Sequence, residues 1–263
     1  RFWGYSGYAI KTNGTLWAWG KNSAGQLGIG NTQAQTAPVQ VGADMDWKQV
    51  AAGCSSVLAL KSDGSLWGWG FNMYSELFGH EGKQLSPVRL GSETDWEQVV
   101  VIDFRAYAVK KDGTLWAWGD NANNLLGFNT PTEEETTAEG NPVEVVTVPQ
   151  ITAPTHVTSI EGKVLTISGC ENTLSVATGT DGVIEKVWML GSNTDGALGD
   201  GKGLGNGNKD IPFAKVPVHP SLKSSLKFAG MSSGQNYTVM LTTDGDIWGW
   251  GCNRGGQLGD ETP

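Results

Sequence analysis

Short alternating runs of apolar and polar residues, each closed by a glycine, recur along this chain. The clearest run follows an Asp-Gly or Asn-Gly pair and reads Leu-Trp-x-Trp-Gly, as in residues 16–20 and 66–70. Side chains two positions apart lie on the same face of a β-strand, so the paired tryptophans predict strands with one indole-bearing face. Complete or looser copies occur at residues 13–28, 63–72, 112–121, 181–193 and 244–253.

The second copy shows the full set of predicted elements. Its apolar runs predict four strands, at residues 47–53, 56–61, 66–69 and 87–90, the last an edge strand because it opens on a proline. Asp63-Gly64 predicts a two-residue type I′ hairpin turn, since both residue types tolerate the positive φ that this turn requires. Four short antiparallel strands in each repeat are typical of a β-propeller blade.

The spacing of the closing glycines sets the length of the repeat. Gly20 to Gly70 spans 50 residues and Gly70 to Gly119 spans 49, whereas Gly119 to Gly191 spans 72 and Gly191 to Gly251 spans 60. A period near 50 residues indicates stacked units that bury their faces against one another. We therefore expect residues 1–263 to form a single all-β propeller domain of about five recognisable blades. Both chain ends interrupt a repeat, and insertions are expected at about 128–157 and 200–212.

Composition narrows the possible partners. The net charge is −9, the isoelectric point is near 4.8, and the arginines are Arg1, Arg89, Arg105 and Arg254. Nucleic-acid binding needs clustered cations, so no nucleic-acid partner is expected. No apolar run reaches the ~18 residues of a membrane span. The three cysteines form no Cys-x-x-Cys pair, which argues against a disulfide framework. The chain starts at Arg1 without an initiator methionine, and we expect a longer gene product at an extracellular or cell-surface location.

Residues that could carry catalysis are scattered. His80, His156 and His219 show no ligand spacing, and no nucleophile motif such as Gly-x-Ser-x-Gly is present. Asn206-x-Asn208-x-Asp210 lacks the glycine and the glutamate of a calcium loop. We therefore expect no enzyme activity, no cofactor, no metal site and no small-molecule ligand. The repeated tryptophans and asparagines are interpreted as packing residues and turn-stabilising residues, respectively.

The repeat resembles that of the regulator-of-chromosome-condensation family. The shared elements are an apolar strand, Asp-Gly, an aromatic strand ending in Gly, an asparagine, and Gly-Gln-Leu-Gly, as in residues 22–28 and 253–259. The resemblance implies a propeller, typically seven-bladed in that family, and the Trp-rich acidic repeats look like those of bacterial members. The nuclear member's nucleotide-exchange and chromatin roles cannot be transferred, because the basic surface is absent. The Gly-Trp-Arg-His-Thr cluster of the plant ultraviolet receptors is absent as well.

Two classes of function remain open. The first is a non-catalytic scaffold that presents loops to a protein partner, as an enzyme inhibitor or a GTPase regulator does. The second is a carbohydrate-binding or polysaccharide-processing module, which would need exposed tryptophans. Tyr, Met and Phe at loop tips are common interface anchors. The candidate contact residues are those where the repeat is interrupted: Met73, Tyr74, Phe78, Phe128, Glu133, Glu134, Glu135, Lys202, Leu204 and Asn206.

Overall fold

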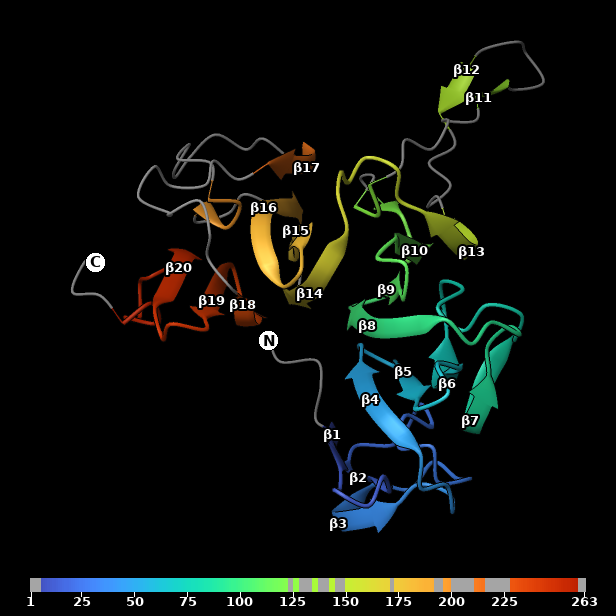
Figure 1. Ribbon diagram of the computed structural model, residues 1–263. Coiled ribbons are helices and arrows are strands. Elements are labelled where there is room, and N and C mark those ends of the chain that lie inside the picture. The colour runs from blue at the N-terminus through green and yellow to red at the C-terminus, as the bar shows by residue number, and fades with distance from the viewer. Residues whose placement is uncertain are drawn as a thin grey trace.

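The computed structural model is built almost entirely of antiparallel β-sheet, which confirms the all-β propeller-type fold (Figure 1). Among the residues that the structure describes there is no α-helix. Those residues are 6–122, 125–127, 134–136, 142–144, 150–170, 173–191, 196–199, 211–215 and 228–259.

Five of the sheets follow the sequence repeats and are called blades 1 to 5 here. Blade 1 contains β1 (Ser6–Ile10), β2 (Leu16–Gly20) and β3 (Gln35–Gln40), and blade 2 contains β4 (Trp47–Ala52), β5 (Ser56–Lys61), β6 (Leu66–Asn72) and β7 (Gly82–Arg89). Blade 3 contains β8 (Trp96–Ile102), β9 (Arg105–Lys110), β10 (Leu115–Asp120) and β13 (Gln150–His156).

Blade 4 contains β14 (Val164–Cys170), β15 (Thr173–Thr180), β16 (Val183–Gly191) and β17 (Ile211–Lys215). Blade 5 contains β18 (Phe228–Gly234), β19 (Tyr237–Thr242) and β20 (Ile247–Gly251). A separate two-stranded hairpin consists of β11 (Glu134–Thr136) and β12 (Pro142–Glu144). In blade 2 the fourth strand, β7, lies at the end of its sheet as predicted, but it begins at Gly82, so Pro87 lies within the strand and not at its start.

The blades follow one another along an arc, with β4, β8, β14 and β18 on its inner side (Figure 1). Each hydrophobic core lies between two blades rather than within one. The core between blades 1 and 2 combines Leu16 and Leu27 of the first with Trp47, Val57 and Trp69 of the second. Blades 2 and 3, 3 and 4, and 4 and 5 share similar clusters. A single blade therefore cannot bury its apolar faces by itself.

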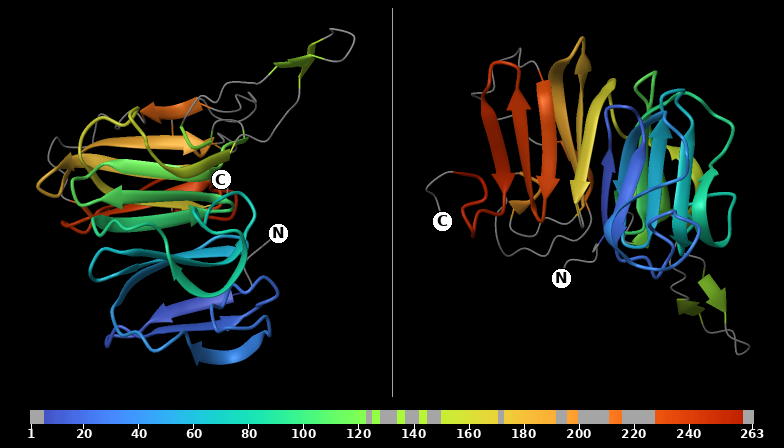
Figure 2. Two further views of the ribbon diagram at one scale, coloured as in Figure 1. Left: turned by 90° about the vertical axis from the view of Figure 1, so that its right-hand side faces the viewer. Right: turned by 90° about the horizontal axis from the view of Figure 1, so that it is seen from below.

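The connections between strands alternate between two faces of the blades. The Asp-Gly hairpins join the second and third strands on one side, which we call the hairpin face. The turn from the first to the second strand and the connection from the third to the fourth lie on the other side, which we call the Asn-loop face. Figure 2 shows the strands running between these two faces.

The predicted type I′ turn at Asp63-Gly64 is wrong. Gly64 has φ +84°, but Asp63 is not in the positive-φ region. The Gly64 amide donates to the Lys61 carbonyl (3.0 Å) and the Lys61 amide to the Ser65 carbonyl (3.1 Å), so the loop has three residues and ends on a left-handed glycine. The side chain of Asp63 explains the difference, because it accepts from the Ser65 amide (2.8 Å) and hydroxyl (2.6 Å). Among the repeat turns that the structure describes, Asp181-Gly182 alone has positive φ at both residues.

The repeated asparagines organise the Asn-loops, as the sequence predicted. The Asn22 side chain is fully buried; its Oδ1 accepts from the Leu27 amide (2.9 Å), and its Nδ2 donates to the carbonyls of Asn31 (2.9 Å) and Gln33 (3.0 Å). Asn72, Asn121 and Asn253 accept in the same way from the amide of the leucine five residues later, at 2.9 to 3.0 Å. The asparagine thus replaces backbone partners that an irregular loop lacks.

In the early repeats the two tryptophans play different roles. The first, as in Trp67, donates through Nε1 to the Ser65 hydroxyl (2.9 Å), and Trp17 and Trp116 bond to Thr15 and Thr114 in the same way. The second donates to the preceding blade: Trp69 to the Gln26 carbonyl (2.7 Å) and Trp118 to the Glu76 carbonyl (2.8 Å). Both second tryptophans are fully buried.

Replacing Asn22 with alanine is expected to destabilise the protein by about 2–3 kcal/mol, because three buried backbone groups lose their partner. Asn22→Asp keeps the acceptor but loses the two donated bonds, so we expect this variant to be less stable than the wild type at neutral pH as well. Urea unfolding of the three proteins measures the difference. An alanine variant as stable as the wild type would contradict a structural role for this asparagine.

The last repeat breaks the hydroxyl pattern and supplies a second prediction. Asp246 stands where Ser65 and Thr114 stand in other repeats, and within the described residues the buried Nε1 of Trp248 has no hydrogen-bond partner. Asp246→Thr would restore the hydroxyl and is expected to stabilise the protein by about 1 kcal/mol. Asp246→Val has a similar shape without a hydroxyl and serves as the control. Equal unfolding midpoints for the two variants would refute this explanation.

Candidate functional site

The longest insertions and the interruption at Met73 fall in one kind of connection. Met73 lies in the connection from β6 to β7, residues 121–149 connect β10 to β13, and residues 192–210 connect β16 to β17. Each runs from the third to the fourth strand of its blade, and the ends of these strands lie on the Asn-loop face. The β11–β12 hairpin, which belongs to the second of these connections, projects away from the blades (Figures 1 and 2). The topology therefore concentrates the variable segments on one face.

Two of these segments touch at blades 2 and 3. The Ser75 hydroxyl donates to Oε1 of Gln150 (3.3 Å), the first residue of β13. Ser75 has φ +66°, a conformation that non-glycine residues rarely adopt, so this loop has a strained backbone at its contact point.

An aromatic surface lies beside this contact. Met73 is 47% exposed, and the Tyr74 ring packs against Phe104 with centroids 4.9 Å apart. Phe104 belongs to the β8–β9 turn, and both rings are half-buried. We call these three residues the Met73–Tyr74–Phe104 surface. A thioether next to two half-exposed rings gives apolar contact area whose shape can adapt to a partner.

A polar network holds the turn under this surface. The Cys54 amide donates to the Asp103 carbonyl (3.2 Å), and the Cys54 thiol donates to Asp103 Oδ1 (3.4 Å). Arg105, which is buried, pairs with Asp103 Oδ2 at 3.2 Å. Burial, followed by the charge of Asp103, raises the pKa of the Cys54 thiol to about 12. The thiol is therefore protonated at neutral pH, which makes it a structural group and not a nucleophile.

Glu76 lies at the inner end of the same loop and is fully buried. Its Oε2 accepts from the Tyr74 amide (2.8 Å), and its Oε1 accepts from the Ser56 hydroxyl (3.2 Å). Burial raises the pKa of this carboxyl, although the hydrogen bonds from the backbone and Ser56 oppose the shift. Gln26 and Gln257 occupy the same repeat position and accept the equivalent amide bond through a neutral side chain. Glu76 is thus an acidic substitute in a site built for glutamine.

The sequence-predicted contact residues are distributed as follows. Met73 and Tyr74 come together on the surface just described. Phe78 instead packs edge-on against Trp118 between blades 2 and 3, with ring centroids 5.6 Å apart. Glu134 and Glu135 lie in β11, whose backbone alone is described. The other five predicted contact residues lie outside the described residues: Phe128, Glu133, Lys202, Leu204 and Asn206.

Parts of the expected insertions are regular strands. Gln150–His156 forms β13, the fourth strand of blade 3, and Ile211–Lys215 forms β17 in blade 4. The added residues therefore precede these strands. Sequence reasoning also missed Phe104, Asp103 and Cys54, which lie in first-to-second-strand turns. An aromatic residue at such a turn, between two clearly predicted strands, was the signal that could have identified Phe104.

Metal-binding side chains do not gather in the described parts of the chain. No group of three or more His, Cys, Asp or Glu side chains there could hold a metal ion. The described tryptophans are all buried or half-buried, so none offers an open ring for stacking on a sugar. No helix within those ranges is long and apolar enough to cross a membrane.

Known proteins share both the repeat and the architecture. Residues 13–60 and 228–257 match the regulator of chromosome condensation (RCC1) repeat. The chain carries RCC1 repeats. The X-linked retinitis pigmentosa GTPase regulator of Canis lupus familiaris is 28% identical over 111 residues, which is 42% of this chain and 10% of that protein.

Solved structures with the RCC1-type fold are similar to nearly the whole of this chain. Human WBSCR16 superposes with a TM-score of 0.73 at 20% identity, covering 97% of this chain and 61% of that one. Prp20p from Saccharomyces cerevisiae has a TM-score of 0.69 at 18% identity, covering 94% of this chain and 56% of that one. This chain therefore spans a little over half the length of these solved propellers and about a tenth of the curated relative.

The variant Glu76→Gln tests whether the buried carboxylate of Glu76 lowers the stability of the protein at neutral pH. The raised pKa means that the folded state holds the proton more tightly than the unfolded state, so wild-type stability falls as pH rises from the unfolded pKa through the folded pKa. Glutamine fits this position in two other repeats and carries no charge. We expect the variant to be more stable than the wild type at pH 7 and about equal to it near pH 3.

Urea unfolding at both pH values measures this effect. Glu93→Gln, at an exposed residue, is the matched control and should change stability little at either pH. A Glu76→Gln variant that is less stable at pH 7 would show that the charge itself stabilises the loop.

Proposed function

We propose that this protein is a non-catalytic interaction scaffold that binds a protein partner through its Asn-loop face, with the Met73–Tyr74–Phe104 surface as an anchor. The observation that carries the proposal is an exposed methionine directly before Tyr74 in the chain, with the Tyr74 and Phe104 rings packed together, on the face where the three connections emerge. The rigid blades hold this surface in place, so little conformational entropy is lost on binding.

The names of similar proteins support a binding role in general terms. One curated relative is a GTPase regulator, and Prp20p binds Gsp1p and histones. The acidic composition of this chain, with net charge −9, favours a partner with a basic surface. The third-to-fourth-strand connections also contain other predicted contact residues, so we include these in the proposed contact face. They are Glu133, Glu134, Glu135, Lys202, Leu204 and Asn206.

The carbohydrate alternative lacks its defining feature in the described residues. Stacking on a sugar requires an open aromatic face, whereas the first tryptophans of the early repeats, Trp17, Trp67 and Trp116, are tied to a Thr or Ser hydroxyl. Of the second tryptophans, Trp69 and Trp118 are fully buried and Trp19 is half-buried. The protein-binding proposal is therefore preferred.

Met73→Asp tests the proposed anchor. The full chain is used as bait in a native extract, and the affinity of the recovered protein is then measured with both purified components. Removal of a central apolar anchor is expected to weaken that complex by about 2 kcal/mol, or roughly 30-fold. Met45→Asp is the matched control, because Met45 is 62% exposed and lies on the hairpin face, in the connection from β3 to β4.

Two outcomes would contradict the proposal. Equal loss of affinity in the Met73 and Met45 variants would show that the effect does not come from the Asn-loop face. Tight, saturable binding on a glycan array, together with the absence of a protein complex, would favour the carbohydrate class.

A further inference from the structure

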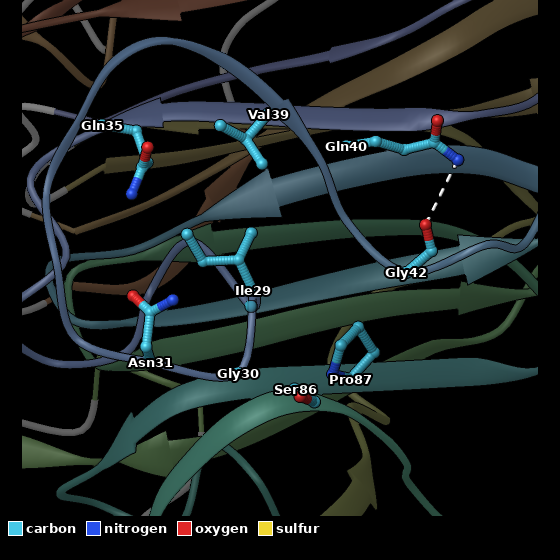
Figure 3. A pocket seen from close by; sticks show the side chains of 10 residues that line it. Ile29, Gly30, Asn31, Gln35, Val39, Gln40, Gly42, Ser86 and Pro87 are labelled. Atoms are coloured by element: carbon cyan, nitrogen blue, oxygen red, sulfur yellow. Dashed lines mark hydrogen bonds between the residues drawn. The ribbon is translucent and has the colours of Figure 1, made fainter.

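A groove of about 360 Å³ lies between the outer strands of blades 1 and 2. Ile29, Val39 and Pro87 provide its apolar walls, and Asn31, Gln35 and Gln40 line its rim (Figure 3). No charged side chain lines it. It shares no residue with the Met73–Tyr74–Phe104 surface and is independent of the proposed function.

The repeat itself shows what fits in this space. Gly28 and Phe78 occupy the same repeat position, each directly after a fully buried leucine. Phe78 packs edge-on against Trp118, and its ring would lie 3.3 Å from a Cβ added at Gly91. The equivalent of Gly91 in blade 1 is Gly42, where an added Cβ would meet nothing within 4 Å. An aromatic ring therefore fills, between blades 2 and 3, the space that is open between blades 1 and 2.

The chain cannot close the open groove from position 28. Gly28 has φ +69°, which disfavours any side chain. An added Cβ would also lie 2.8 Å from Nε1 of Trp69, the atom that bonds to Gln26. The groove is therefore a consequence of how the first repeat packs against the second, and an aromatic ring must come from elsewhere.

We propose that this groove binds an aromatic side chain of an extended, uncharged segment of a partner protein. The internal template, Phe78 on Trp118, supplies the side-chain class. The volume lies near the lower end of the range of small-molecule sites and is large enough for one aromatic side chain. β3 is the last strand of its sheet, so an extended segment can pair with its outer edge. The side-chain amides of Gln35 and Gln40 stand at the rim; their nitrogens donate to the carbonyls of Gln33 and Gly42, and their oxygens can accept from the segment. Any charged residue entering the groove would lose water without gaining a counter-ion.

The test uses the peptide Ac-Gly-Thr-Gln-Phe-Thr-Gln-Gly-NH2 and versions with Leu, Lys or Glu in place of Phe, titrated into the full chain and followed by amide chemical shifts. We expect saturable shifts at Val39, Gln40 and Ser86 with the Phe peptide. The Lys and Glu peptides should bind at least about tenfold more weakly.

Three variants localise the binding. Ser86→Phe places a ring in the groove from β7, since the Ser86 hydroxyl lies 3.8 Å from a Cβ added at Gly30, and it should abolish binding. Ala153→Phe makes the same change at the equivalent exposed position of β13 and should leave binding unchanged. Phe78→Ala opens the second groove and should raise the stoichiometry from one peptide to two.

Several results would overturn the proposal. These are equal binding of the Phe and Glu peptides, unchanged binding by Ser86→Phe, and equal loss of binding by Ala153→Phe. Maltoheptaose producing the same shifts would assign the groove to a glycan. Self-association that Ser86→Phe abolishes, seen by sedimentation, would assign it to a second copy of this chain. The Met73→Asp variant should bind the Phe peptide normally, which separates this test from that of the proposed function.

Discussion

The contact of blade 1 with blade 2, and that of blade 2 with blade 3, each depend on one buried tryptophan that makes both an apolar and a polar connection. The indoles of Trp69 and Trp118 fill the space between sheets, and each buries on the order of 200 Å², worth roughly 5 kcal/mol as an upper estimate. Each Nε1 also bonds to a carbonyl in the Asn-loop of the preceding blade. The correct shape of one loop is therefore required for the core of the next interface. The asparagine that orders the loop therefore also stabilises the packing between blades.

Most of the fold could be predicted from sequence because the residues that form these contacts recur in several repeats. Strands with a period of two, paired tryptophans and repeated asparagines each recur several times, so an error in one copy is corrected by the others. The turn at Asp63-Gly64 was predicted wrongly because the pattern of residue types does not show what a side chain bonds to. Asp63 accepts two bonds from Ser65 and so stabilises a three-residue loop instead of a type I′ turn. Thr180 and Val183, by contrast, pair directly across Asp181-Gly182.

The candidate site was only partly predictable for a related reason. Met73 and Tyr74 could be identified because they depart from the repeat, but Phe104 and Cys54 lie about 30 and 20 residues away and approach only when blades 2 and 3 pack together. Phe78 also departs from the repeat, yet its ring faces Trp118. A departure from the pattern therefore identifies where two copies differ without showing whether the new side chain faces solvent or a neighbouring blade.

The same constraint accounts for the uneven distribution of variation between the two faces. On the hairpin face, each Asp-Gly loop contacts the connection that enters the next blade: the Trp47 amide donates to the Gly14 carbonyl and the Trp96 amide to the Gly64 carbonyl. In blade 4 the extra residues on this face lengthen strands β15 and β16 and leave a loop of only two residues. On the Asn-loop face, the asparagine satisfies the start of the third-to-fourth-strand connection, and the remaining residues are free to lengthen because loop closure costs little per added residue. The fold can therefore accept new contact residues on the Asn-loop face while the indole-to-carbonyl bonds between blades remain intact.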